Sequence, residues 1–161
     1  MFCDNVAMSD WLELMNVIDS CSSLFLRDIG EPEENVLRLV LHEGKVSAQS
    51  ESLEIAGTKI DGLHRLYTGT DSRLIELVWR KYVAYGVTNE SFAVKEGITS
   101  PDSGKLLRRY SKSAFLDYVA HSTLATDMYP GPYTHVEVVA ENHIVDVVST
   151  ELPRLSLLRP V

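Results

Sequence analysis

Three side chains near the C-terminal end could transfer a proton or bind a cation: His135, Glu137 and Asp146. They lie in two segments, 134–140 and 143–149, in which valines alternate with polar residues, a pattern typical of strands. The intervening Glu141-Asn142 suits a two-residue hairpin loop. In that register Glu137 lies directly opposite Asp146, with His135 on the same face. Because nitrogen and oxygen donors of this kind serve in acid–base and metal sites, we name the three as candidate catalytic residues.

Two carboxylates that face each other across a hairpin repel and need compensation. A Lys or Arg from a neighbouring strand, exposure to solvent, a shared proton or a bound cation would each provide it. The first two are the simpler explanations, so we assign no metal and no cofactor. The sequence also lacks an HExxH pair, a GxSxG elbow and a glycine-rich phosphate loop. We therefore favour binding over catalysis and keep an enzyme or metal-binding domain built on this cluster as the alternative.

The acidic residues are concentrated in the first 34 positions. This segment has eight acidic residues and one basic residue, Arg27. Its net charge is therefore −7, out of −8 for the whole chain. Such an imbalance creates a local field that attracts a cationic partner. We expect a basic protein partner, as for an immunity-type neutraliser, and name its contact residues as Asp28, Glu31, Glu33 and Glu34. A plainer alternative is that these acids form a solvated turn and that others complement the dipole of the first helix.

The hydrophobic pattern predicts the elements that position these residues. Apolar residues at helical spacing predict one helix over 9–19 and another near 112–126, where Ser111 or Ser113 would be the N-cap. Alternation predicts strands elsewhere, and Gly- or Pro-rich segments predict loops. The predicted strands are 24–28, from 36 onward, 52–56, 63–67, a long one over 73–88, and the two of the C-terminal hairpin. The long strand is expected to bend, either at Gly86 or at a bulge near Arg80-Lys81. The loop is 30–34, and the tail after Pro153 is expected to lie across the surface.

Together these elements predict an α+β fold. Few helices separate the strands, so neighbouring strands should pair antiparallel. We expect a mostly antiparallel, curved sheet of about six to seven strands with two helices, in a single domain over 1–161. A chain of 18.0 kDa with 45% hydrophobic residues can bury a core of its own.

Composition also restricts the environment and the partners. The net charge of −8 disfavours nucleic acid, whose binding begins with cations that neutralise phosphates. No run of about 20 apolar residues could span a membrane, and the first residues lack the cationic start of a secretory signal. We expect a cytoplasmic protein whose two cysteines, Cys3 and Cys21, are reduced. Self-association through sheet edges is a further alternative.

Overall fold

The protein is described from a computed structural model, which covers residues 3–93 and 99–159, with side chains from residue 10 onward. The described residues contain two α-helices, a short 3₁₀ helix and nine strands, so the predicted α+β class is confirmed. In chain order these are α1 (Cys3–Asp19), β1 (Ser23–Glu33), β2 (Val36–Ile55), β3 (Thr58–Tyr67), β4 (Leu74–Trp79), β5 (Tyr82–Asn89), η1 (Glu90–Phe92), β6 (Leu107–Tyr110), α2 (Ala114–Ser122), β7 (Thr134–Val139), β8 (His143–Ser149) and β9 (Arg154–Leu158).

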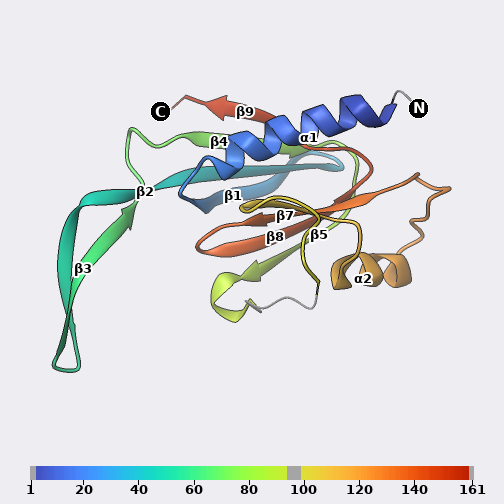
Figure 1. The fold of residues 1–161 in the computed structure, drawn as a ribbon. Coiled ribbons are helices and arrows are strands. Elements are labelled where there is room, and N and C mark those ends of the chain that lie inside the picture. Colours follow the sequence, from blue (N-terminus) through green and yellow to red (C-terminus); the bar gives the residue numbers. More distant parts are fainter. Residues whose placement is uncertain (1–2, 94–98, 160–161) are drawn as a thin grey trace.

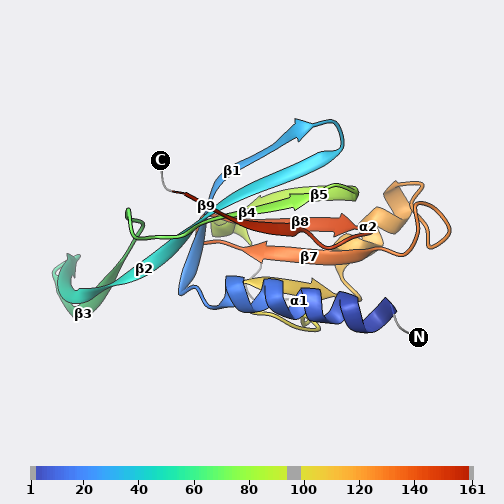
Figure 2. The same cartoon turned by 90° about the horizontal axis from the view of Figure 1, so that it is seen from above.

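The strands form two antiparallel sheets instead of one. The first sheet has the order β1-β2-β4-β9, and β3 pairs with the outer half of β2; the second has the order β5-β8-β7-β6. Figure 1 shows the sheets as two layers with α1 along one side, and Figure 2 shows the same arrangement from above. The β2–β3 hairpin extends away from the two layers in both views.

The core lies between the inner faces of the two sheets and α1. Trp11, Leu14 and Ile18 recur at helical spacing, and this stripe of α1 is buried as predicted. The rest of the core comes mainly from alternate residues of both sheets: Leu24, Leu37, Leu39, Leu41, Ile75, Leu77, Trp79, Leu107, Val136, Val138, Val145 and Val147. Cys21, Leu106 and Ala140 contribute from the adjoining connections. Burial of one face explains the alternation of the strands that line the core, whereas β3 has no buried residue.

Three predicted elements differ from the structure. The long strand over 73–88 is two strands, β4 and β5, which lie in different sheets and separate at Arg80-Lys81, one of the two places where a bend was expected. The predicted loop at 30–34 belongs mainly to β1, and the turn is at Glu34-Asn35, where Asn35 has a φ of 60°. The tail after Pro153 forms β9, which pairs with β4. For β4 and β9 the partner strand is distant in the chain, so local sequence does not reveal the pairing, whereas residues 30–33 pair with the adjacent strand β2.

The helices also have different bounds. α1 begins at Cys3, six residues before the predicted start, and α2 is shorter than the predicted 112–126. Ser113 is the N-cap of α2, as one of the two predicted alternatives: its Oγ accepts from the backbone N–H of Leu116 at 3.0 Å. None of the helices among the described residues is both long and apolar enough to cross a membrane.

Candidate functional site

The C-terminal hairpin has the predicted register. Glu137 is the cross-strand partner of Asp146, and the backbone N–H of Ala140 donates to the carbonyl of His143 at 3.0 Å around the two-residue loop. The valine-rich face packs into the core, while the face that carries His135, Glu137 and Asp146 points away from it. The structure therefore brings the three predicted side chains together on the outer face of the second sheet.

His135 is buried, and both of its ring nitrogens have a partner. Its Nε2 lies 2.9 Å from Oδ1 of Asp146, and its Nδ1 lies 2.9 Å from Oγ of Ser113. In a neutral imidazole the first contact requires the proton on Nε2, so Nδ1 accepts from the Ser113 hydroxyl. The ring also stacks on Tyr110 with centroids 4.9 Å apart and contacts Phe115 at 5.5 Å. The imidazole thus joins the cap of α2 to strand β8.

Glu137 has a cation on the neighbouring strand, one of the compensations predicted from the sequence. Nη1 of Arg108 on β6 donates to its Oε1 at 3.0 Å, and the hydroxyl of Tyr110 donates to the same oxygen at 3.0 Å. Burial and the nearby carboxylate raise the pKa of Tyr110, so its hydroxyl remains a donor. Glu137 and Asp146 consequently each have their own partner.

The order Ser113–His135–Asp146 is that of nucleophile, base and acid, but its surroundings favour a structural role. Ser113 Oγ already accepts from the helix as its N-cap. A cavity of about 470 Å³ reaches Arg108, Glu137 and Asp146, yet its lining includes neither His135 nor Ser113. A substrate in that cavity would not touch the imidazole. The arrangement therefore positions α2 on the sheet.

A metal centre has no support in the described part of the chain. No group of three His, Cys, Asp or Glu side chains gathers there in a way that could bind an ion. Two of the predicted candidates, Glu137 and Asp146, are instead held by Arg108 and His135. Partners of this kind satisfy the carboxylates without a cation.

The early acidic residues lie on two separate elements. Asp10 and Glu13 are exposed on α1, whereas the four predicted contact residues lie on the β1–β2 hairpin, at the far edge of the first sheet (Figure 2). Asp19 is used internally: its carboxylate accepts the backbone N–H groups of Lys105, Leu106 and Leu107 at 2.7–3.1 Å. The sequence assigned Asp19 no such role, because its partners lie more than 80 residues away.

The four carboxylates of the β1–β2 hairpin differ in their contacts. Asp28 forms an ion pair of 3.0 Å with Arg38, and Glu31 accepts from the hydroxyl of Tyr82. That hydrogen bond raises the pKa of Tyr82 to about 12. Glu33 and Glu34 are exposed at the turn, and neither forms an ion pair with another described residue. The tip of the hairpin is thus the part of this acidic segment that is open to a partner.

A larger cleft of about 700 Å³ lies between α1 and the connection from β8 to β9. The cleft is lined by charged residues of both signs. Three are acidic and two are basic: Asp10, Glu13 and Glu151, and Arg109 and Arg154. Opposite charges around an open cleft largely cancel, so this cleft does not select a ligand by charge alone.

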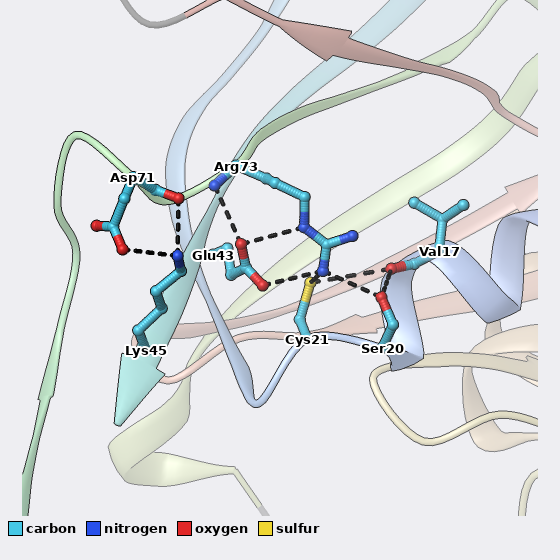
Figure 3. A network of polar contacts seen from close by, with 7 residues as sticks. All are labelled: Val17, Ser20, Cys21, Glu43, Lys45, Asp71 and Arg73. Atoms are coloured by element: carbon cyan, nitrogen blue, oxygen red, sulfur yellow. Dashed lines mark hydrogen bonds and ion pairs between the residues drawn. The ribbon is translucent and has the colours of Figure 1, made fainter. Parts of the chain in front are cut away.

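Cys21 belongs to a polar network that fastens the end of α1 to the first sheet (Figure 3). The guanidinium of Arg73 donates to Cys21 Sγ at 3.1 Å, to Ser20 Oγ at 3.0 Å and to Glu43 Oε1 at 2.9 Å. Burial raises the pKa of the Cys21 thiol, which is free, as expected for a reduced cysteine packed in the core. The side chain of Cys3 lies outside the described residues.

No family model matches this chain, and neither the curated proteins nor the solved structures that were searched include a match.

Proposed function

We propose that this chain is a protein-binding domain that engages a basic protein, in the manner of an immunity-type neutraliser, through the acidic β1–β2 hairpin. The observation that carries the proposal is the exposure of the Glu33 and Glu34 side chains to solvent. Both are exposed at the turn, and neither is ion-paired within the described residues. Exposed, unpaired charges steer an oppositely charged surface toward the contact and raise the association rate.

Two further carboxylates of the hairpin are pre-organised. Arg38 holds Asp28, and Tyr82 holds Glu31 from the second sheet. A side chain that is already ordered loses less conformational entropy when a partner binds. Residues 28–36 contain four acids and no base, while Arg27 and Arg38 flank them, so the charge is one-sided only toward the turn of the hairpin.

The catalytic alternative has less support. Its central residue, His135, is buried, and each of its ring nitrogens has an internal partner. A general base must reach the proton that it abstracts, directly or through one water molecule. The neighbouring cavity offers no such path to the imidazole.

The test is a titration with a defined partner. Affinity capture from the host, followed by mass spectrometry, supplies a candidate, which is then purified and titrated with wild type and with E33Q/E34Q. We expect the double variant to bind about tenfold more weakly at low ionic strength, mainly through a slower association rate. At about 300 mM salt the difference should shrink, because the Debye length falls below about 6 Å.

The matched control is D127N/E141Q, which removes the same charge from two exposed positions elsewhere. It should bind like wild type apart from a small effect of net charge. Equal losses in both double variants would show that overall charge and not the hairpin drives binding. An unchanged affinity in E33Q/E34Q would exclude the hairpin as the contact.

A further inference from the structure

Residues 46–67, here called the arm, form a two-stranded ribbon outside both layers of the body. The inner half of β2 pairs with β1 as far as Gly44 and with β4 as far as His42, whereas the outer half pairs with β3 alone. Figure 1 shows the arm bending away from the first sheet toward the side on which η1 lies. Every residue from Ala48 to Arg65 is exposed. An isolated two-stranded ribbon of this kind is only marginally stable in water.

One face of the arm is apolar. Leu53 is the cross-strand partner of Ile60, and the same face continues to Ile55 on β2 and to Leu63 on β3. These four side chains are 38–55% exposed. The polar residues of this face are Glu51 and Thr58, the cross-strand partners of Leu63 and Ile55. The other face carries Glu54 and Lys59, which are cross-strand partners, along with serines. A large apolar stripe that nothing in the described chain covers marks a contact surface.

The edges of the arm are poorly suited to strand addition. The β2–β3 ladder has two register shifts, one between Val46 and Ser50 and one between Glu51 and Leu53. β3 also carries the exposed charges Lys59 and Arg65. Bulges and charged side chains are the usual protection of an edge against pairing with another chain. The arm is therefore suited to contact through its apolar face.

The body offers a complementary surface on β5. Tyr85 and Val87 are the cross-strand partners of Val147 and Val145, which are fully buried in the core. Cross-strand partners share a face, so Tyr85 and Val87 lie on the core side of their sheet. They are nevertheless 38% and 44% exposed, because β5 is an edge strand. The core is thus open along this edge.

The area that the arm can bury indicates which kind of partner it binds. The two strands of the arm, 46–55 and 58–67, are each ten residues long, so at about 3.3 Å per residue and about 10 Å across the ribbon presents roughly 330 Å² on one face. Laid on another surface it buries about 660 Å² in all, which is below the roughly 1,200 Å² of a stable interface. Two reciprocal contacts bury about 1,300 Å², which reaches that size. Only a second copy of this chain doubles the contact by symmetry.

We propose that the chain forms a symmetric dimer in which the apolar face of each arm packs on the open core edge at β5 of the other copy. Leu53 and Ile60 of one copy then contact Tyr85 and Val87 of its partner, and the relation is reciprocal. The inference does not depend on the proposed function, because it uses the arm and not the exposed turn at Glu33 and Glu34. The two surfaces adjoin, however: Tyr85 packs edge-on against Tyr82, whose hydroxyl holds Glu31. The two interactions also respond oppositely to salt: each copy carries −8, so salt strengthens self-association and weakens the binding of a basic protein.

Sedimentation velocity with the full chain, from about 1 to about 100 µM, tests the proposal. Wild type should shift with concentration toward twice the 18.0 kDa of one chain. L53S/I60S, on the arm, should weaken association at least tenfold, and V87S, on the receiving edge, about tenfold. Unchanged melting temperatures of dilute samples would confirm that the variants fold, since the substituted side chains are exposed.

The matched control is L124S/M128S, which removes two apolar side chains that are 90% and 93% exposed on a loop outside the proposed interface. It should dimerise like wild type. A wild-type chain that stays monomeric at 100 µM in about 300 mM salt would overturn the proposal. So would a dimer that persists in L53S/I60S, or one that L124S/M128S dissociates instead. A loss of basic-partner binding in L53S/I60S, with no wild-type dimer, would assign the arm to that partner and would equally overturn it.

Discussion

Both ring nitrogens of His135 are occupied, and this decides what the residue does. A buried polar group is stabilising only if its hydrogen bonds are made, and here Ser113 and Asp146 make them at 2.9 Å each. His135 and Asp146 were two of the three residues whose spacing suggested chemistry, with Glu137 as the third. The pairing of Glu137 with Asp146 across the hairpin was predictable, because one two-residue loop determines the whole register. Ser113 was not predictable as a partner, since it lies 22 residues away.

The first prediction concerns Ser113. In S113A the helix loses its N-cap and Nδ1 of His135 loses its donor, so we expect a destabilisation of about 2–3 kcal/mol in urea unfolding. The matched control is S111A, whose hydroxyl only bonds Asp102 at the surface and whose loss should cost less than about 0.5 kcal/mol. Equal effects of the two substitutions would contradict the anchoring role of Ser113.

At the scale of elements, β2 serves two purposes in one strand. Its inner half is core, with Leu37, Leu39 and Leu41 fully buried, and its outer half is arm. The sequence already indicated the change, since regular apolar alternation ends near Gly44 and serines and glutamates follow. It also marked the tip of the arm through Gly57. The weaker predicted strands at 52–56 and 63–67 are the two sides of this ribbon.

The second prediction is that the body folds without the arm. Val46 and Leu66 are cross-strand partners, so residues 47–65 can be replaced by Asn-Gly, which closes a two-residue turn. We expect the shortened chain to keep the near-ultraviolet circular dichroism of wild type and, in dilute samples, a melting temperature within about 3 °C of it. A molten or unfolded product would show that the arm belongs to the core. A control that replaces only 56–57 with Asn-Gly separates the effect of the new turn from that of the missing arm.

At the scale of the whole molecule, the acidic first 34 residues do not form a single surface. Asp10 and Glu13 lie on α1, and Glu33 and Glu34 lie at the other edge of the first sheet. Other carboxylates hold the elements together: Glu43 fastens β2 to Arg73, and Glu76 pairs with Arg38 at 2.6 Å. Charge therefore contributes to both the surface and the architecture of this protein.

The third prediction is acid sensitivity through Glu43. The hydrogen bonds from Arg73 hold the pKa of Glu43 below its ordinary value of 4.5. A carboxyl with a lowered pKa in the folded state stabilises the fold fully above about pH 4.5, and this contribution disappears as the pH falls through the folded-state pKa. We expect the free energy of unfolding to decrease below pH 4.5, and to decrease less steeply in E43Q.

Urea titrations at pH 7 and at about pH 3.5 measure this difference. E43Q should be less stable than wild type at pH 7 by about 1–2 kcal/mol, because a charge-assisted hydrogen bond is lost. The exposed variant E141Q should keep the pH dependence of wild type. Identical pH profiles for E43Q and wild type would show that other carboxylates cause the acid sensitivity.

The sequence by itself determined the local order of this protein. Helical spacing located α1, alternation located most strands, and the Glu141-Asn142 loop determined that Glu137 faces Asp146. Only the tertiary structure decided which strands share a sheet, because hydrogen bonds between strands far apart in the chain leave no periodic signal. It separated β4 from β5, recruited the tail as β9, and placed the acids of α1 and of the β1–β2 hairpin at different edges. The physical reason is that the spacing of apolar side chains along one segment shows which of its faces is buried. The segment that packs against this face is determined by the fold of the whole chain.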